Sequence, residues 1–369
     1  MNVLIVPDKF KGTLSARAAA EAIARGWRQA RPGDFLTSLP MSDGGDGFGD
    51  VMGHLLHAKL QRTKTVDAAH RPCVAHWWWE PKTKTAVIES ASVIGLAKLP
   101  PGQFHPFQLD TFGLGAVIRA AARKGAKRCI IGIGGSATND GGFGLARALG
   151  WKFHDHDGAL IEQWTDLDGL ARISLPTRRR WFQELIVAVD VQNPLLGVHG
   201  ATRVYGPQKG LRPEDFSVAE KCLKRLSVIC KQKLGRSLSH RPGAGAAGGL
   251  GFGLMTFLGA KAEPGFGLFA RFARLSEHLR TADLVITGEG CIDESSFMGK
   301  GVGEIVRRCR KRNVPCVALA GKIKSSPAVD QFFAKARSLT KFAGANNAQR
   351  RPAQTLERLA ERMARQAKA

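Results

Sequence analysis

Five short segments of this chain are rich in glycine or in the acidic, amide and lysine side chains that bind phosphate groups and their metal ions. In chain order they are residues 7–13 (PDKFKGT), 40–47 (PMSDGGDG), 132–142 (GIGGSATNDGG), 189–194 (VDVQNP) and 288–293 (GEGCID). Each follows an apolar run typical of a β-strand, and open α/β sheets bind ligands at the carboxyl ends of their strands. Phosphoryl transfer requires backbone amides, cations and carboxylates for Mg²⁺. The set therefore predicts a phosphotransferase.

Segment 132–142 is the most informative of the five. The apolar run before it predicts a strand, and the amphipathic segment 143–150 after it predicts a helix that Asn139 or Asp140 would cap. A loop of small residues between a strand and a helix leaves backbone N–H groups uncovered. It directs them, together with the helix N-terminus, at an anion. The segment predicts a phosphate cradle.

A dinucleotide-binding turn is the alternative interpretation of the same segment. Gly132, Gly134 and Ala137 match the pattern G-x-G-x-x-A, and Asp155 follows 18 residues beyond Ala137. An NAD(P)-dependent oxidoreductase would use these residues. The loop 136–142 argues against it, because it delays the helix that should meet the pyrophosphate. The chain contains no Walker A sequence, so a P-loop site is not indicated.

Composition limits the partners of the protein. Lysine and arginine total 55 against 31 acidic residues, but the charges are dispersed, which favours steering of an anionic small molecule over specific nucleic-acid binding. The seven cysteines form no CxxC pair, as expected of free thiols in a reducing compartment. No apolar run could span a membrane and the N-terminus has no basic leader, so we expect a cytoplasmic protein. The sequence leaves open whether the protein forms a homo-oligomer.

Strand-like and helix-like segments alternate along most of the chain, which predicts an α/β fold. Segments 59–66, 73–80 and 84–90 interrupt the alternation and predict three consecutive strands. Segment 241–253 (RPGAGAAGGLGFG) is so rich in glycine that it predicts an irregular loop.

The alternating blocks at the two ends of the chain predict one sheet, with the middle of the chain inserted between them. The fold class expected is two α/β domains. A Rossmann-like three-layer domain would comprise residues 1–66 and 282–369, and an inserted mixed-sheet domain would comprise residues 67–281.

Read in order, these motifs resemble the bacterial glycerate kinase family. The most specific strings are GGSATNDGG at 134–142 and GPQKG at 206–210. They are accompanied by PDKFKGTLSA at 7–16, PMSDGG at 40–45, DVQNPL at 190–195, PGAGAAGGLG at 242–251, DLVITGEG at 283–290, Asp293 and Gly299-Lys300. The resemblance implies ATP-dependent phosphorylation of D-glycerate with Mg²⁺, with 2-phosphoglycerate favoured over 3-phosphoglycerate as product. Three positions depart from the family pattern, since Lys9 replaces a usual serine, Cys291 a usual arginine and Ser295 a usual glutamine.

This interpretation assigns roles to individual residues. The residues expected to bind the phosphates of ATP are Gly134, Gly135, Ser136, Thr138 and Asn139. Lys11 and Lys209 would neutralise the transferring phosphoryl group. Asp43 and Asp190 would hold Mg²⁺, or one of them would accept the hydroxyl proton. The residues expected to bind the glycerate substrate are Asn193, Glu289 and Asp293.

Overall fold

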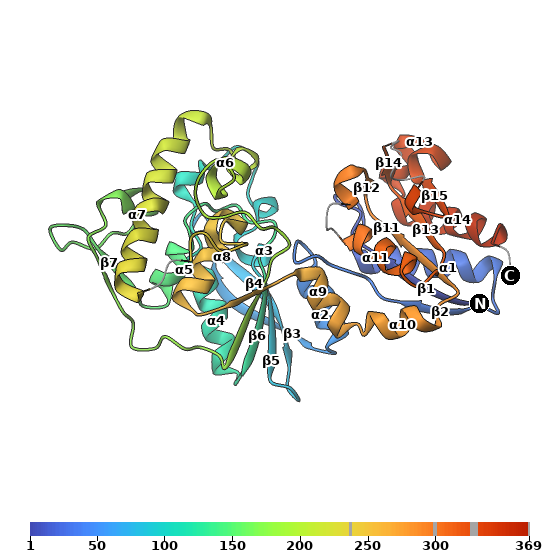
Figure 1. Cartoon of the computed structure of the whole chain (residues 1–369), viewed down its shortest axis with the longest axis horizontal. Coiled ribbons are helices and arrows are strands. Elements are labelled where there is room, and N and C mark those ends of the chain that lie inside the picture. Colours follow the sequence, from blue (N-terminus) through green and yellow to red (C-terminus); the bar gives the residue numbers. More distant parts are fainter. Residues whose placement is uncertain (236–237, 298–300, 325–330, 368–369) are drawn as a thin grey trace. The chain divides into compact units, whose positions relative to one another are not determined.

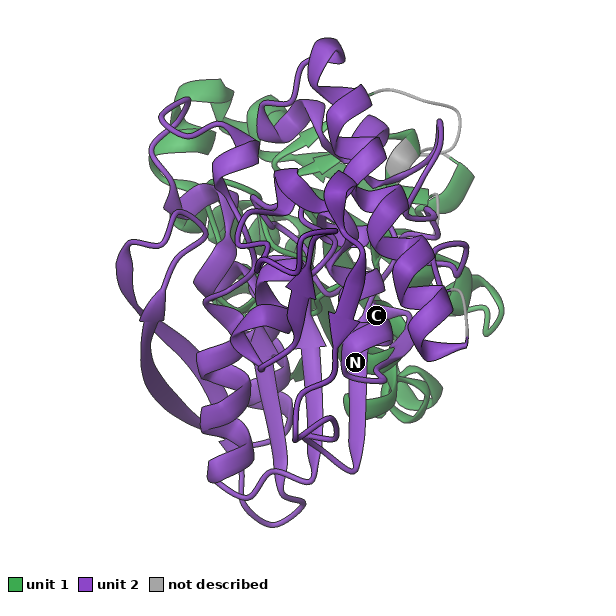
Figure 2. Ribbon diagram, turned by 90° about the vertical axis from the view of Figure 1, so that its left-hand side faces the viewer, with its two compact units in different colours: residues 1–43, 266–369 green, residues 44–265 purple. Residues whose placement is uncertain are grey.

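The computed structural model describes residues 1–235, 238–297, 301–324 and 331–367, so Gly299 and Lys300 lie outside the described residues (Figure 1). The chain forms two compact units. Unit 1 comprises Met1–Asp43 and Phe266–Ala369, and unit 2 comprises Gly44–Gly265 (Figure 2). Unit 2 is thus inserted into unit 1. The chain crosses between the units after residues 43 and 265, whereas the sequence pattern places the crossings after residues 66 and 281.

The sheet of unit 1 has five parallel strands in the order β15-β13-β11-β1-β2. They are β1 (Asn2–Pro7), β2 (Phe35–Ser38), β11 (Leu284–Gly288), β13 (Cys316–Ala320) and β15 (Lys335–Ser338). The three central strands are buried and apolar over nearly their whole length, as expected of parallel strands covered on both faces. The chain runs outward from β1 on one side and from β11 on the other. The topological switch point therefore lies between β1 and β11.

Helices and two short strands complete unit 1. They are α1 (Ala16–Ala30), α9 (Gly265–Phe272), α10 (Leu275–Thr281), α11 (Gly301–Arg310), α13 (Leu339–Arg350), α14 (Pro352–Arg365), β12 (Cys291–Ile292) and β14 (Lys322–Ile323). Ser15 caps α1 by accepting the N–H of Ala18 at 3.1 Å, because its hydroxyl satisfies a donor that the first helical turn leaves open. Helices α1 and α14 share a core with the sheet that includes Trp27 and Leu356, while α11 packs on β11. Unit 1 is the predicted Rossmann-like domain.

Unit 2 contains a six-stranded mixed sheet in the order β10-β9-β6-β5-β4-β3. The strands are β3 (Lys59–Val66), β4 (Pro72–Glu80), β5 (Thr85–Glu89), β6 (Arg128–Gly132), β9 (Glu184–Ala188) and β10 (Lys261–Glu263). The first three are consecutive and antiparallel, as predicted, and the others join in parallel. Gly132 lies opposite Ala188 in the register of β6 and β9. The loops after these two strands therefore leave the same edge of the sheet side by side.

The helices of unit 2 form two cores. These elements are α2 (Phe48–Leu55), α3 (Ala91–Ile94), α4 (Leu114–Arg123), α5 (Phe143–Ala148), α6 (Ala201–Tyr205), α7 (Phe216–Leu234), α8 (Ala246–Phe257) and the hairpin of β7 (Lys152–His154) and β8 (Arg172–Ser174). Helices α3, α4 and α8 pack with the sheet in the main core. Helices α5, α7 and α8 and the hairpin enclose a second core around Phe153 and Trp164.

The prediction of an irregular loop over 241–253 is wrong for its second half. Ala247, Gly248 and Gly249 do have left-handed backbone angles, with φ of 55°, 67° and 85°, so a tight turn is present. Helix α8 continues beyond it, because Leu250 and Leu254 enter the main core and Phe252 enters the second one. Burial on all sides overrides the low helix propensity of its glycines. Among the described residues, no helix is both long and apolar enough to cross a bilayer.

Candidate active site

The loop after β6 presents backbone N–H groups that no described atom of the chain accepts. We call residues 134–140 the cradle loop. The N–H groups without a described acceptor are those of Gly135, Ser136, Thr138, Asn139 and Asp140. The last four of these residues are buried, and buried N–H groups without acceptors are rare in native proteins. These N–H groups are therefore available to donate hydrogen bonds to a ligand or to water.

Side chains of the cradle loop add further polar atoms. Thr138 Oγ1 and Asn139 Oδ1 are buried and have no hydrogen-bond partner in the described part of the chain. The Asn139 Nδ2 group donates to Thr202 Oγ1 at 3.1 Å, which anchors this side chain on α6. A buried polar atom without a partner costs free energy unless a ligand or water completes it. These two side-chain atoms lie in the same loop as the N–H groups without described acceptors.

Lys209 lies against the cradle loop, at the end of the 3₁₀ helix η4 (Pro207–Lys209). Its Nζ donates to Thr138 O at 2.6 Å and to Ser136 Oγ at 3.1 Å. The residue is only 6% exposed, and among the described residues no ion pair to it is present. Burial lowers the pKa of Lys209 to about 7, against the opposing effect of the Asp140 charge. The site thus holds an amine whose cationic form is destabilised by burial.

Two glycines allow the backbone to close around the cradle loop. A Cβ at Gly248 would lie 1.9 Å from Thr138 O, and Gly248 also has a φ of 67°. A Cβ at Gly134 would lie 2.5 Å from the Cα of Gly45. Any larger residue at either position would displace the backbone of the loop, since real Cβ atoms do not approach other atoms so closely. Gly134 thus lets segment 40–47 approach the cradle loop closely, and Gly248 lets segment 242–251 do the same.

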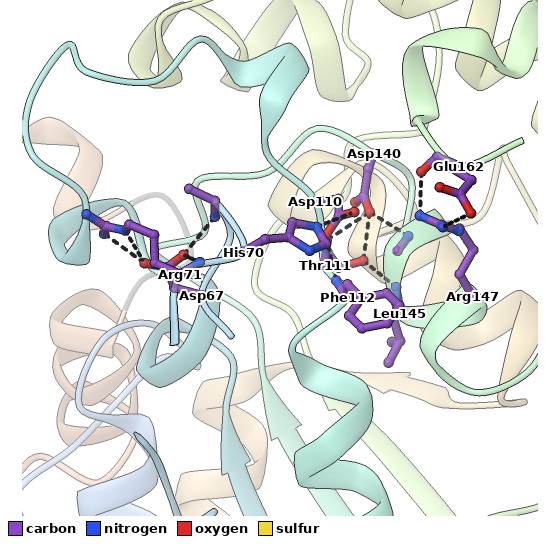
Figure 3. Close-up of polar contacts among 12 residues, drawn as sticks. Asp67, His70, Arg71, Asp110, Thr111, Phe112, Asp140, Leu145, Arg147 and Glu162 are labelled. Carbon is purple, nitrogen blue, oxygen red and sulfur yellow. Dashed lines mark hydrogen bonds and ion pairs between the residues drawn. The ribbon is translucent and has the colours of Figure 1, made fainter. Parts of the chain in front are cut away.

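Asp140 holds the end of the cradle loop from inside the protein (Figure 3). Its Oδ2 accepts hydrogen bonds from the Thr111 N–H at 3.0 Å, the Thr111 hydroxyl at 2.7 Å and the Gly144 N–H at 2.9 Å. Its Oδ1 accepts the Gly142 N–H at 3.1 Å. Burial, and after it the charge of nearby Asp110, raise the pKa of Asp140 to about 6. Asp110 in turn pairs with His70 at 3.0 Å.

The start of helix α5 corrects one prediction about the loop. Neither Asn139 nor Asp140 is the N-cap residue, because the helix begins at Phe143 with Gly142 before it. The first amides of the helix are used internally: Asp140 takes the Gly144 N–H, and Thr111 Oγ1 takes the Leu145 N–H at 2.8 Å. The helix N-terminus is thus closed to a ligand. Anion binding at this site would rest on the loop amides alone.

The loop after β9 carries Asp190 and Asn193 from the same sheet edge as the cradle loop. Asp190 is half-buried and lies two residues past the end of the strand. The Asn193 side chain is engaged locally, since Nδ2 donates to His199 O at 2.8 Å and Oδ1 accepts the Tyr205 hydroxyl at 2.6 Å. Asn193 therefore braces its own loop in this structure.

Unit 1 carries carboxylates at its switch point. Asp8 directly follows β1, Glu289 directly follows β11, and Asp43 ends the first segment of the unit. Burial raises the pKa of Asp8 to about 7, with further contributions from the negative charges of Asp43 and, to a smaller degree, Glu289. Lys9 opposes the shift through its backbone N–H and its charge. Asp43 and Glu289 are thus close enough to Asp8 for their charges to influence it.

The remaining predicted residues of unit 1 lie nearby in the fold. Lys11 is exposed, and a Cβ at Gly290 would lie 2.8 Å from its backbone nitrogen. Asp293 pairs with Lys324 at 3.3 Å. The Lys9 carbonyl accepts the Gly290 N–H at 3.4 Å, next to Cys291. Lys9 and Cys291, two of the three positions that depart from the family pattern, therefore lie on neighbouring segments of the chain.

Comparison with known proteins agrees with the motifs and the fold. The model of the glycerate kinase family matches residues 3–368. The chain belongs to the glycerate kinase family. It is 38% identical to a glycerate kinase of Bacillus subtilis, over 90% of this chain and 88% of that protein. It is 36% identical to a glycerate 2-kinase of Escherichia coli, over 88% and 86% of the two chains.

A solved structure extends the comparison to three dimensions. The crystal structure of a protein from Salmonella typhimurium LT2, provisionally named glycerate kinase 2, superimposes with a TM-score of 0.84. It is 33% identical to this chain, and the match covers 99% of this chain and 97% of that one. The prediction of an α/β kinase of this family is confirmed, and the protein is an enzyme of the phosphotransferase class.

Mg²⁺, the metal ion expected from the sequence, is bound by oxygen ligands. Among the described residues, no group of three or more histidine, cysteine, aspartate or glutamate side chains could hold a metal ion. Mg²⁺ is often held by only one or two carboxylates together with phosphate oxygens of the substrate. The carboxylates of Asp43 and its neighbours in unit 1 are of the right chemical kind for such a partial set.

The geometry does not suit the dinucleotide alternative. In that motif the acidic residue follows a strand parallel to and near the first one. Here β6 pairs with β5 and β9, whereas Asp155 follows β7, which pairs with β8 in a separate antiparallel hairpin. Asp155 Oδ1 accepts the N–H groups of Asp157 and Ala159, at 3.0 and 2.8 Å, and so caps a turn.

Three residues in these networks were not selected from the sequence. Asp8 belongs to the motif at 7–13 and directly follows the first strand. This position at a strand end could have identified it as a candidate site residue, in the same way as Asp43. Asp140 was expected only as a helix cap. Thr111 lies 29 residues before Asp140 in an unremarkable segment, and nothing in the sequence indicated their contact.

Proposed function

We propose that this member of the glycerate kinase family transfers the γ-phosphoryl group of ATP to D-glycerate, and that the product is 2-phosphoglycerate. The observation that carries the proposal is the set of five backbone N–H groups in the cradle loop without described acceptors, with a buried lysine against them. A phosphate group supplies several acceptor oxygens and negative charge in one place. The name of the similar Escherichia coli protein, a glycerate 2-kinase, supports the 2-hydroxyl as acceptor.

The cradle loop would bind phosphate oxygens of ATP through the N–H groups of Gly135, Ser136 and Asn139 and the Thr138 hydroxyl. Phosphoryl transfer depends mainly on positioning and on stabilising charge in the transition state. Donors that are already fixed in a buried loop need no reorganisation when that charge develops. This is why the rigid packing of the loop at Gly134 and Gly248 suits the reaction.

Carboxylates would serve the other needs of the reaction. Asp190, on the same sheet edge as the cradle loop, is our candidate for the base that accepts the hydroxyl proton, with metal binding as its other role. In unit 1, Asp43 would be a ligand of Mg²⁺. When bound, this ion would neutralise charge on the phosphates. Lys11 would bind a phosphate oxygen, and Glu289 and Asp293 the hydroxyl groups of glycerate.

One experiment tests donor, acceptor and regiochemistry together. The purified protein is incubated with Mg²⁺, ATP and D-glycerate, and the products are followed by ³¹P NMR. We expect ADP and the resonance of 2-phosphoglycerate. A 3-phosphoglycerate resonance would overturn the regiochemistry, and no transfer from ATP would overturn the donor. Tight binding of NAD(P)H without binding of Mg-ATP would instead favour the oxidoreductase alternative.

A further inference from the structure

We propose that Lys209 is a positioning residue, which fixes the Thr138–Asn139 peptide so that the Asn139 N–H faces the phosphoryl group, and that it does not contact the phosphate itself. The inference rests on the proposed function, because it assumes that the cradle loop binds phosphate. It differs from the sequence prediction, in which Lys209 neutralises the phosphoryl group directly.

The argument begins with the side of the peptide on which the amine lies. Lys209 Nζ donates to Thr138 O at 2.6 Å. All described peptide bonds of the chain are trans, so the carbonyl oxygen and the N–H of one peptide unit point in opposite directions. The Asn139 N–H therefore points away from Nζ. An amine on the carbonyl side of this peptide is on the wrong side to share a phosphate oxygen with that N–H.

Other contacts around the lysine fix the same orientation. Gly248 closes the carbonyl side, since a Cβ there would lie 1.9 Å from Thr138 O. Ser136 Oγ takes a second hydrogen bond from Nζ at 3.1 Å. Because both acceptors belong to the cradle loop, the hydrogen bonds of the amine hold the backbone of this loop in place. Rotation of the peptide would break the short bond to Nζ and leave a buried amine without one of its two acceptors.

A neighbouring peptide of the cradle loop is oriented in the same way by a different donor. The Leu96 N–H donates to Gly135 O at 2.9 Å, which turns the Ser136 N–H to the opposite side. Two of the N–H groups without described acceptors therefore belong to peptides whose carbonyl oxygens are held. The first is held by a backbone amide and the second by a lysine side chain. Only the second can be removed by changing a side chain and leaving the backbone intact.

The test combines kinetics with one NMR resonance. Lys209→Met removes both hydrogen bonds at similar volume, and Lys209→Gln keeps neutral N–H donors without the charge. We expect Lys209→Met to lower kcat by about 10²–10³-fold, the cost of one misplaced transition-state donor, with the KM for D-glycerate nearly unchanged. Lys209→Gln should keep kcat within about tenfold of the native value. A cation in direct contact with phosphate predicts that both variants are equally impaired.

The NMR measurement reports the peptide itself. The chain has only six asparagines, so ¹⁵N-asparagine labelling gives a simple amide spectrum in which Asn139 is assigned from an Asn139→Ser variant. With the non-hydrolysable analogue β,γ-imido-ATP, the Asn139 amide should shift downfield in the native protein and in Lys209→Gln. At saturation it should not shift in Lys209→Met. An equal shift in Lys209→Met would overturn the inference.

The two proposals can fail separately. If the Asn139 amide of the native protein does not respond to the analogue, the phosphate-binding role of the cradle loop is wrong. If it responds there but also responds fully in Lys209→Met, only the role of Lys209 is wrong. Should Lys209→Met not fold, Lys209→Gln decides alone. An intact Asn139 response with a kcat within about tenfold of native supports positioning, and a larger loss of kcat contradicts it.

Discussion

The two units build the carboxyl edges of their sheets from opposite chemistry. In unit 2 the edge at β6 presents backbone N–H groups, and its buried acid, Asp140, is turned inward with its oxygens accepting four hydrogen bonds. In unit 1 the edge at β1 and β11 presents Asp8, Asp43 and Glu289. One edge thus suits an anion and the other suits a cation or hydroxyl groups. The same α/β arrangement supports both, because the strand ends fix only position and the loops supply the charge.

Asp190 is one exception to this comparison, since it is a carboxylate on the amide-rich edge of unit 2. Glu89 at the end of β5 is another, and its carboxylate accepts the N–H groups of Gly47 and Gly49. If Asp190 is the base, Asp190→Asn should lower kcat by about 10²–10⁴-fold without loss of structure. Steady-state kinetics and circular dichroism measure the two effects. Asp155→Asn is the matched control, because Asp155 only caps a turn, and its kcat should stay near the native value. Near-native turnover in Asp190→Asn would remove it from the mechanism.

The fixed shape of the cradle loop is tested by Gly248→Ala. The new Cβ would lie 1.9 Å from Thr138 O at a left-handed φ, so it must displace the carbonyl that Lys209 holds. We expect kcat to fall about 10²-fold, as for the loss of one transition-state donor. Gly169→Ala is the control, because no atom lies within 4 Å of a Cβ at that position. Equal kinetics in the two variants would show that the loop tolerates distortion.

The buried amine of unit 2 should also be visible in stability. The pKa of Lys209 falls from 10.5 to about 7 on folding, so above pH 7 the unfolded chain binds more protons than the folded one. The free energy of unfolding should therefore rise with pH, by about 1.4 kcal/mol per unit between pH 7.5 and 9, relative to Lys209→Met.

Urea titrations followed by tryptophan fluorescence measure this difference. Six of the seven tryptophans belong to unit 2, so the signal reports mainly that unit. Lys152→Met, at an exposed site of the same unit, should keep the native pH dependence. The same slope in Lys209→Met and in the native protein would mean that the amine stays charged in the fold.

The carboxylate edge of unit 1 is tested through the metal requirement. Asp43→Asn removes one negative charge from a Mg²⁺ ligand set, so we expect about tenfold more Mg²⁺ for half-maximal activity and a smaller change in kcat at saturation. Glu21→Gln, an exposed position of the same unit, should leave the Mg²⁺ curve unchanged. An unshifted curve in Asp43→Asn would place the metal ligands elsewhere.

Local sequence patterns were sufficient for most of the fold. The apolar run of β1, the Ser15 cap of α1 and the three consecutive strands of unit 2 were all predictable, because each depends on neighbouring residues. Helix α8 was missed, since its glycines argue against a helix and only burial between two cores overrides them. The sequence pattern also did not show where the chain crosses between the units. The alternation of strands and helices is interrupted at residue 59, whereas the first crossing lies after residue 43.

The sequence by itself determined which residues gather at the strand ends, because a motif such as 134–142 carries its residue types and order directly. It could not determine which atoms of these residues are free to act. Only the tertiary structure decided that the amides of α5 are taken by Asp140 and Thr111, while those of the cradle loop are left open. The physical reason is that a hydrogen bond depends on partners brought close by packing. Thr111 and Lys209 are 29 and 71 residues away from the groups they hold.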